Sequence, residues 1–128
     1  TEVNPETNHP VICILPEQMK ITQKGGTMRL GSWPAKLKEK SLIAKIYKNC
    51  LVKERHRHRF EINPKYIKTL EKHGLIFSGK NPEKPIMEFL ELEEHPFFIA
   101  TQAHPEFKST FENPSPVFLG FIKSIIKN

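Results

Sequence analysis

The sequence predicts one α/β domain in which short strands alternate with amphipathic helices. Apolar runs with aromatic residues, such as residues 86–92 and 97–103, are typical of strands. Apolar residues at helical spacing over residues 117–126 are typical of a helix. The 128 residues, 38% of them hydrophobic, are enough for one modest core, and no segment has the apolar length that a bilayer span needs.

The N-terminal third of the chain predicts two strands and a helix. Residues 10–16 form an apolar run between prolines, which favours a short buried strand. Residues 25–31 are bounded by glycines and predict a turn that enters a strand, because their spacing matches no phosphate-binding loop. Residues 41–47 predict a short amphipathic helix with its N-cap at Ser41.

The middle of the chain predicts a helix followed by strands. The helix spans residues 63–74, with a proline in its first turn and a glycine at its C-terminal end. Residues 75–79 and 86–92 read as strands, joined by a turn over residues 81–85. The second of these strands should pair as a hairpin with the buried strand at residues 97–103.

Pro116 is in the first turn of a C-terminal helix. We expect the apolar face of this helix to pack against the sheet.

The net charge of +6 is spread over scattered lysines, apart from one dense basic segment at residues 53–59. Cys13 and Cys50 are far apart and lack C-x-x-C spacing, so we expect a reducing, cytoplasmic location and no zinc site. Neither cysteine has a basic or glycine-rich neighbourhood that would activate its thiol. We therefore expect neither to be a nucleophile.

Residues 55–62 alternate strictly, so a strand would carry Arg55, Arg57 and Arg59 on one face and the two histidines on the other. Such a strand is compatible with phosphate contacts to nucleic acid, with a two-histidine metal site, or with a carboxylate held by one arginine. A solvated edge strand is an equally good interpretation.

The apolar run at residues 97–103 ends in His104, Pro105 and Glu106. A proline cannot donate to a sheet ladder, so the strand should stop near His104. An imidazole oriented by a carboxylate forms two members of a nucleophile–His–acid arrangement. A surface turn without a chemical role is the alternative.

Four blocks make the sequence recognisable, and their order and spacing are specific. They are Gly25-Gly26-Thr27-Met28-Arg29-Leu30-Gly31, the run from Glu54 to Pro64, His95-Pro96-Phe97-Phe98, and His104-Pro105-Glu106-Phe107. Together they resemble the C-terminal part of the class I glutamine amidotransferase (glutaminase) domain of CTP synthases. The resemblance covers nearly the whole chain, as one segment from residue 1 to 128, and implies a flavodoxin-like α/β fold with a mixed sheet and flanking helices.

The resemblance assigns roles to four residues. His104 matches the general acid–base of glutamine hydrolysis, and Glu106 matches the acid that orients it. Glu2 matches a contact to the α-ammonium of glutamine, and Arg59 matches the family's other glutamine contact. The match of Arg59 to a glutamine contact favours a carboxylate site at residues 55–62 over a nucleic-acid or metal site.

The family's nucleophilic cysteine lies in a Gly-x-Cys-x-Gly segment that this sequence does not contain. The resemblance therefore implies that the 128 residues alone do not hydrolyse glutamine. It also implies an N-terminal synthetase domain that uses ATP and Mg²⁺ to convert UTP to CTP, a tetrameric full-length enzyme, and no cofactor or membrane contact for this segment. A non-catalytic relic or a basic nucleic-acid-binding module are the alternatives.

Overall fold

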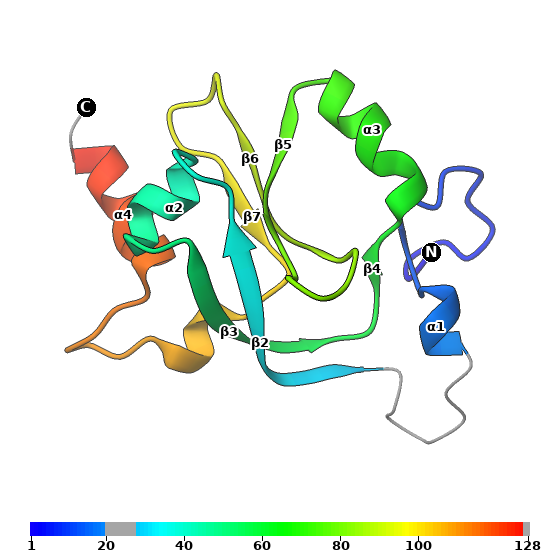
Figure 1. The fold of residues 1–128 in the computed structure, drawn as a ribbon, viewed down its shortest axis with the longest axis horizontal. Helices are drawn as coiled ribbons and strands as arrows, with labels where there is room; N and C mark the ends of the chain where they lie inside the picture. Colours follow the sequence, from blue (N-terminus) through cyan, green and yellow to red (C-terminus); the bar gives the residue numbers. More distant parts are fainter. Residues whose placement is uncertain (20–27, 127–128) are drawn as a thin grey trace.

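The computed structural model describes residues 1–19 and 28–126 (Figure 1). The elements in chain order are β1 (Ile12–Cys13), α1 (Pro16–Met19), β2 (Arg29–Leu37), α2 (Leu42–Tyr47), β3 (Leu51–His58), β4 (Glu61–Ile62), α3 (Pro64–Lys72), β5 (Leu75–Lys80), β6 (Met87–Leu92), β7 (Ile99–Thr101), the 3-10 turn η1 (Pro105–Lys108) and α4 (Pro116–Ile126). The segment at residues 25–31 lies partly outside the described residues, and β2 begins within it, at Arg29.

Five strands form one curled sheet in the order β3-β2-β5-β6-β7, and β1 and β4 form a separate two-stranded ribbon. Every pair in both sheets is antiparallel within the described residues. The structure has the strands and helices of the predicted α/β fold. A mixed sheet would also contain parallel pairs, and none of the pairs among the described residues is parallel. Connectivity accounts for part of this, since β5, β6 and β7 follow one another through loops, and the chain returns from β2 to the neighbouring β3 through α2.

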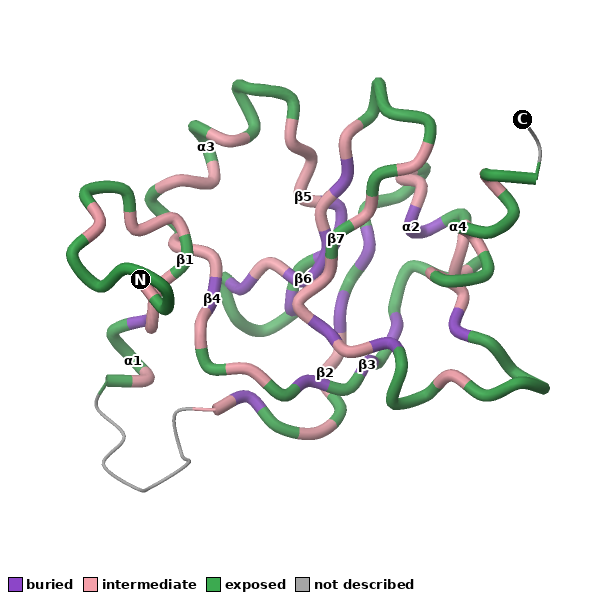
Figure 2. Tube along the Cα trace, turned by 180° about the vertical axis from the view of Figure 1, so that it is seen from behind, coloured by how far each residue is buried: buried purple, intermediate pink, exposed green. Residues whose placement is uncertain are grey.

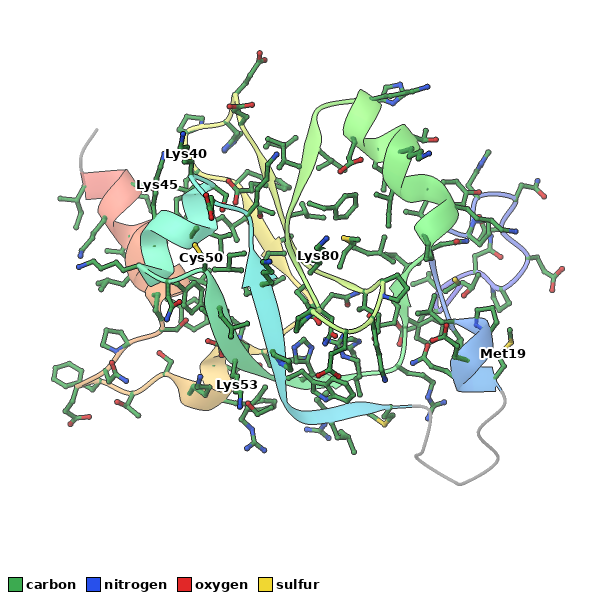
Figure 3. All side chains as sticks on the ribbon, viewed as in Figure 1. Met19, Lys40, Lys45, Cys50, Lys53 and Lys80 are labelled. Atoms are coloured by element: carbon green, nitrogen blue, oxygen red, sulfur yellow. The ribbon has the colours of Figure 1, made fainter. Side chains whose placement is uncertain are left out.

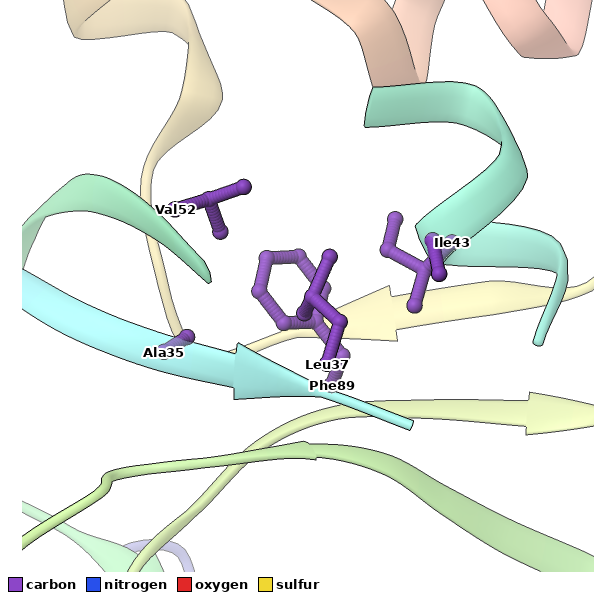
Figure 4. Packing of buried hydrophobic residues seen from close by; sticks show 6 residues of the cluster. Ala35, Leu37, Ile43, Val52 and Phe89 are labelled. Carbon is purple, nitrogen blue, oxygen red and sulfur yellow. The ribbon is translucent and has the colours of Figure 1, made fainter. Parts of the chain in front are cut away.

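The core lies where α2 covers the sheet (Figure 4). Phe89 of β6 is 2% exposed and Ile43 of α2 is fully buried. Ala35, Leu37 and Val52 complete the packing from β2 and β3. Buried positions accordingly gather on the central strands, while the outer loops are exposed (Figure 2).

The helices at residues 41–47 and 63–74 are confirmed. Ser41 caps α2 by accepting a hydrogen bond from the backbone N–H of Ala44. Asn63 caps α3 in the same way, accepting from the N–H of Lys65, and Gly74 follows with a φ of 91°. The positive φ explains why a glycine ends this helix.

Two predicted buried strands are shorter and more exposed than expected. Only Ile12–Cys13 of residues 10–16 is a strand, and Ile12 is 41% exposed, because its one partner is the equally short β4. Only Ile99–Thr101 of residues 97–103 is a strand, and it pairs with β6 as predicted. β7 stays partly exposed because it is the edge of the sheet.

The last helix is less buried than predicted. α4 packs mainly against α2, Val117 reaches the core cluster that α2 and the sheet share, and none of the residues of α4 is buried (Figure 1). Phe121 and Ile125 are 49% and 55% exposed. Among the helices of residues 1–19 and 28–126, none has the length and hydropathy of a membrane-spanning segment.

Candidate active site

The structure brings the predicted acid–base pair together at the start of η1. His104 is the residue before this turn, and its Nδ1 lies 2.7 Å from Oε1 of Glu106. Because a carboxylate only accepts, Nδ1–H donates and Nε2 is left as the basic nitrogen. The hydrogen bond from the backbone N–H of Glu106, together with that from His104, holds the pKa of Glu106 below its usual range.

Two further contacts hold the imidazole. The ring of Phe107 stacks on it with centroids 5.3 Å apart and planes at 23°. The backbone N–H of His104 donates to the carbonyl oxygen of Arg55 at 2.8 Å, which ties the residue to β3. The imidazole is still 38% exposed and therefore accessible to a substrate.

Lys108 ties the other end of η1 to the same strand. Its Nζ donates to the carbonyl oxygen of Lys53 at 2.6 Å and lies 3.7 Å from the buried carboxylate of Glu54 (Lys53 is labelled in Figure 3). The hydroxyl of Tyr47 also donates to Glu54, and burial next to this carboxylate raises the pKa of Tyr47. The turn that carries His104 and Glu106 is thus attached at both ends.

The two residues predicted to contact glutamine share one pocket. Glu2 and Arg59 both line a cavity of about 400 Å³ that opens beside the end of β3. The other lining residues are Ile12, Met28, Arg57, His58, Phe60 and Gln102. A carboxylate and a guanidinium at one pocket suit a zwitterionic amino acid.

Arg59 lies outside the predicted strand. β3 ends at His58, so Arg55 and Arg57 share the exposed face while Arg59 follows in a bend. The carbonyl oxygen of Arg59 accepts a hydrogen bond from Nε2 of Gln18 at 2.8 Å, leaving its exposed guanidinium as the group to meet an anion. The alternation of the sequence could not indicate this bend, which arises where the chain leaves β2 for the β1–β4 ribbon.

A buried polar network lies under the pocket. Nη2 of Arg29 is 2.6 Å from Oε2 of Glu88 and 2.6 Å from Nδ1 of His56, and Nη1 is 3.6 Å from Oε1 of Glu61. His58 joins the network through His56, with 2.9 Å between ring nitrogens. Sequence reasoning missed this role for Arg29, Glu61 and Glu88, although a charged residue at each inward strand position was a usable signal.

Burial sets the protonation of this network. Desolvation, with the nearby cation Arg29, lowers the pKa of His56 to about 3 and of His58 to about 4. Desolvation also raises the pKa of Glu61 to about 7 and raises that of Glu88. The charge of His104 contributes to lowering the pKa of His58, so the acid–base pair lies within electrostatic reach of the pocket.

The histidine pair is therefore engaged with Arg29 and Glu61 rather than open to solvent. In residues 1–19 and 28–126, no three His, Cys, Asp or Glu side chains are grouped to hold a metal ion. Both cysteines are free thiols, and neither lines the pocket formed by the described residues.

Comparison with known proteins gives consistent results. The chain is 54% identical over 127 residues to a CTP synthase of Methanococcus maripaludis and 52% identical over 128 residues to that of Flavobacterium psychrophilum. These matches cover 99% and 100% of the chain but 24% of each relative, so the chain spans about a quarter of their length.

A solved structure, the Trypanosoma brucei CTPS glutaminase domain with bound acivicin, superposes with a TM-score of 0.88 at 36% identity. The match covers 99% of this chain and 50% of that one, and it confirms the predicted class I glutamine amidotransferase fold. The profile described as Glutamine amidotransferase class-I matches residues 6–124. The chain belongs to the class-I glutamine amidotransferase family.

Proposed function

We propose that this chain is the C-terminal part of the glutaminase domain of a CTP synthase and supplies the acid–base pair that releases ammonia from glutamine. The observation that carries the proposal is the 2.7 Å hydrogen bond between His104 and Glu106 on an anchored turn. Glu106 fixes the tautomer, so Nε2 is free to accept and return a proton.

In the proposed reaction, a cysteine thiolate from a part of the protein outside these 128 residues attacks the carboxamide carbon of glutamine. His104 takes the thiol proton and passes it to the departing nitrogen, which leaves as ammonia. Water then hydrolyses the glutamyl thioester with His104 as base. Glu106 stabilises the imidazolium that forms in each half of the cycle.

The pocket supports the proposed position of the substrate. The Glu2 carboxylate is suited to the α-ammonium of glutamine, and the Arg59 guanidinium to its α-carboxylate. We further propose that ammonia passes to a synthetase domain of the same protein, where ATP and Mg²⁺ support amination of UTP in a cytoplasmic tetramer. The 128 residues alone should be inactive.

The test uses His104→Ala in the full-length protein. Glutamine-dependent CTP formation should fall at least about a hundredfold, because general acid–base catalysis contributes that much, while formation from added ammonia should stay near the wild-type rate. His95→Ala, in the exposed loop before β7, is the matched control and should leave both rates unchanged.

Equal loss of the two activities in His104→Ala would contradict the assignment. So would release of ammonia from glutamine by the 128-residue chain alone, if His104→Ala abolished that release, since the nucleophile would then lie within the chain.

A further inference from the structure

Gln102 connects the acid–base pair to the pocket. It lies between the end of β7 and His104, and it lines the pocket with Glu2 and Arg59. Its backbone N–H donates to the carbonyl oxygen of Glu88 at 3.0 Å, so the main chain at this position is held by β6. A side chain placed here faces a substrate bound in the pocket.

The orientation of the Gln102 amide is set by Glu61. Nε2 of Gln102 donates to Oε2 of Glu61 at 3.0 Å. Glu61 is 1% exposed, and its other oxygen faces Arg29 and His58, each at 3.6 Å. In the structure the NH₂ of Gln102 faces Glu61 and its carbonyl Oε1 faces away. Above the pKa of Glu61, about 7, the ionised carboxylate only accepts and so requires this orientation.

We propose that Oε1 of Gln102 accepts a hydrogen bond from the carboxamide N–H of substrate glutamine and so selects glutamine over glutamate. This inference rests on the proposed glutaminase function. Glu2 and Arg59 provide the charges for the α end of the substrate, whereas Gln102 is two residues from His104, which must reach the carboxamide nitrogen. A carboxamide has N–H groups to donate, whereas the carboxylate of glutamate has none and repels a carbonyl oxygen.

The experiment compares two substrates in the full-length protein carrying Gln102→Met. L-Glutamine has a carboxamide N–H, whereas the γ-methyl ester of L-glutamate keeps the α-ammonium and α-carboxylate but has no N–H at the reacting end. Hydrolysis releases ammonia from the first and methanol from the second. The ratio of kcat/KM for glutamine to kcat/KM for the ester should fall about tenfold, the effect of one lost hydrogen bond.

Both rates come from one preparation, so the ratio does not depend on the fraction of folded protein. Gln18→Met is the matched control, because Gln18 holds the backbone of Arg59 near the α end that both substrates share. The ratio of the two kcat/KM values in this variant should equal the wild-type ratio. If Gln102→Met does not fold, Gln102→Asn keeps the amide but shortens it, and its ratio should also fall.

An unchanged ratio in the Gln102 variants would overturn the inference and indicate a purely structural role or a contact to the α-ammonium. Failure of the wild-type protein to hydrolyse either substrate would instead overturn the proposed function.

Discussion

Glu61 lies buried between the guanidinium of Arg29 and the amide of Gln102, which lines the pocket. Burial raises its pKa to about 7 from 4.5, the charge of Glu88 adds to the rise, and Arg29 opposes it. This carboxyl group therefore titrates near neutral pH in the folded protein but well below it in the unfolded chain. Its protonation links the stability of the chain to the geometry of the pocket.

The raised pKa predicts the sign of a pH effect. Between pH 4.5 and about 7 the folded state keeps the Glu61 proton that the unfolded state has lost, so this residue contributes less stability as the pH rises. Glu61→Gln should remove the contribution. Urea titrations at pH 5, 6 and 7 give the free energy of unfolding of wild type and variant. The wild-type value minus the variant value should decline by up to about 1.4 kcal/mol per pH unit.

Glu83→Gln is the control for this measurement. It makes the same change at an exposed carboxyl group in the turn between β5 and β6. The corresponding difference should stay constant from pH 5 to pH 7. A constant difference for Glu61→Gln as well would contradict the raised pKa.

Helix α2 shows how an element depends on its surroundings. Its six residues are too few for a stable isolated helix. Ser41 satisfies one N-terminal N–H, and the carboxylate of Glu91 on β6 accepts from the N–H groups of Leu42 at 2.8 Å and Ile43 at 3.2 Å. The helix is therefore held in place by a side chain of the sheet that it covers.

Glu91→Gln should destabilise the chain by about 1.5–3 kcal/mol, because an amide loses both the charge and one acceptor oxygen. Chemical denaturation followed by far-UV circular dichroism measures the effect. Glu93→Gln, the same change at an exposed position two residues later, should stay within about 0.5 kcal/mol of wild type. Equal effects of the two substitutions would argue against the capping role.

Among the described residues, the main hydrophobic cluster lies between the sheet and α2. Phe89 occupies its centre and meets Tyr47 edge-on, with ring centroids 6.0 Å apart. Gly79 on β5 leaves room for this ring, since a Cβ there would lie 2.6 Å from Cδ2 of Phe89. The acid–base turn and the pocket are both attached to strands that this core holds together.

Phe89→Ala should lower the free energy of unfolding by about 3–5 kcal/mol, through lost burial and the cavity left behind. Phe111→Ala is the matched control, because Phe111 is 97% exposed and its truncation should cost less than about 0.5 kcal/mol. Urea denaturation of both variants gives the comparison, and a loss below 1 kcal/mol for Phe89→Ala would show that the core lies elsewhere.

Local patterns were enough to predict several features. The N-cap at Ser41 and the glycine that ends the helix at residues 63–74 are confirmed, because such signals depend on a few neighbouring residues. His104 and Glu106 are two residues apart, so their contact was also a local prediction.

The sequence by itself therefore determined most local elements, the α/β class and the proximity of His104 to Glu106, through short-range spacing and a recognisable set of motifs. Only the tertiary structure decided that Glu91 caps α2, that Gln102 bonds to Glu61, and that α4 packs mainly against α2. The physical reason is separation along the chain: these partners are more than 40 residues apart or depend on how elements stack, and periodicity contains no information about such pairings.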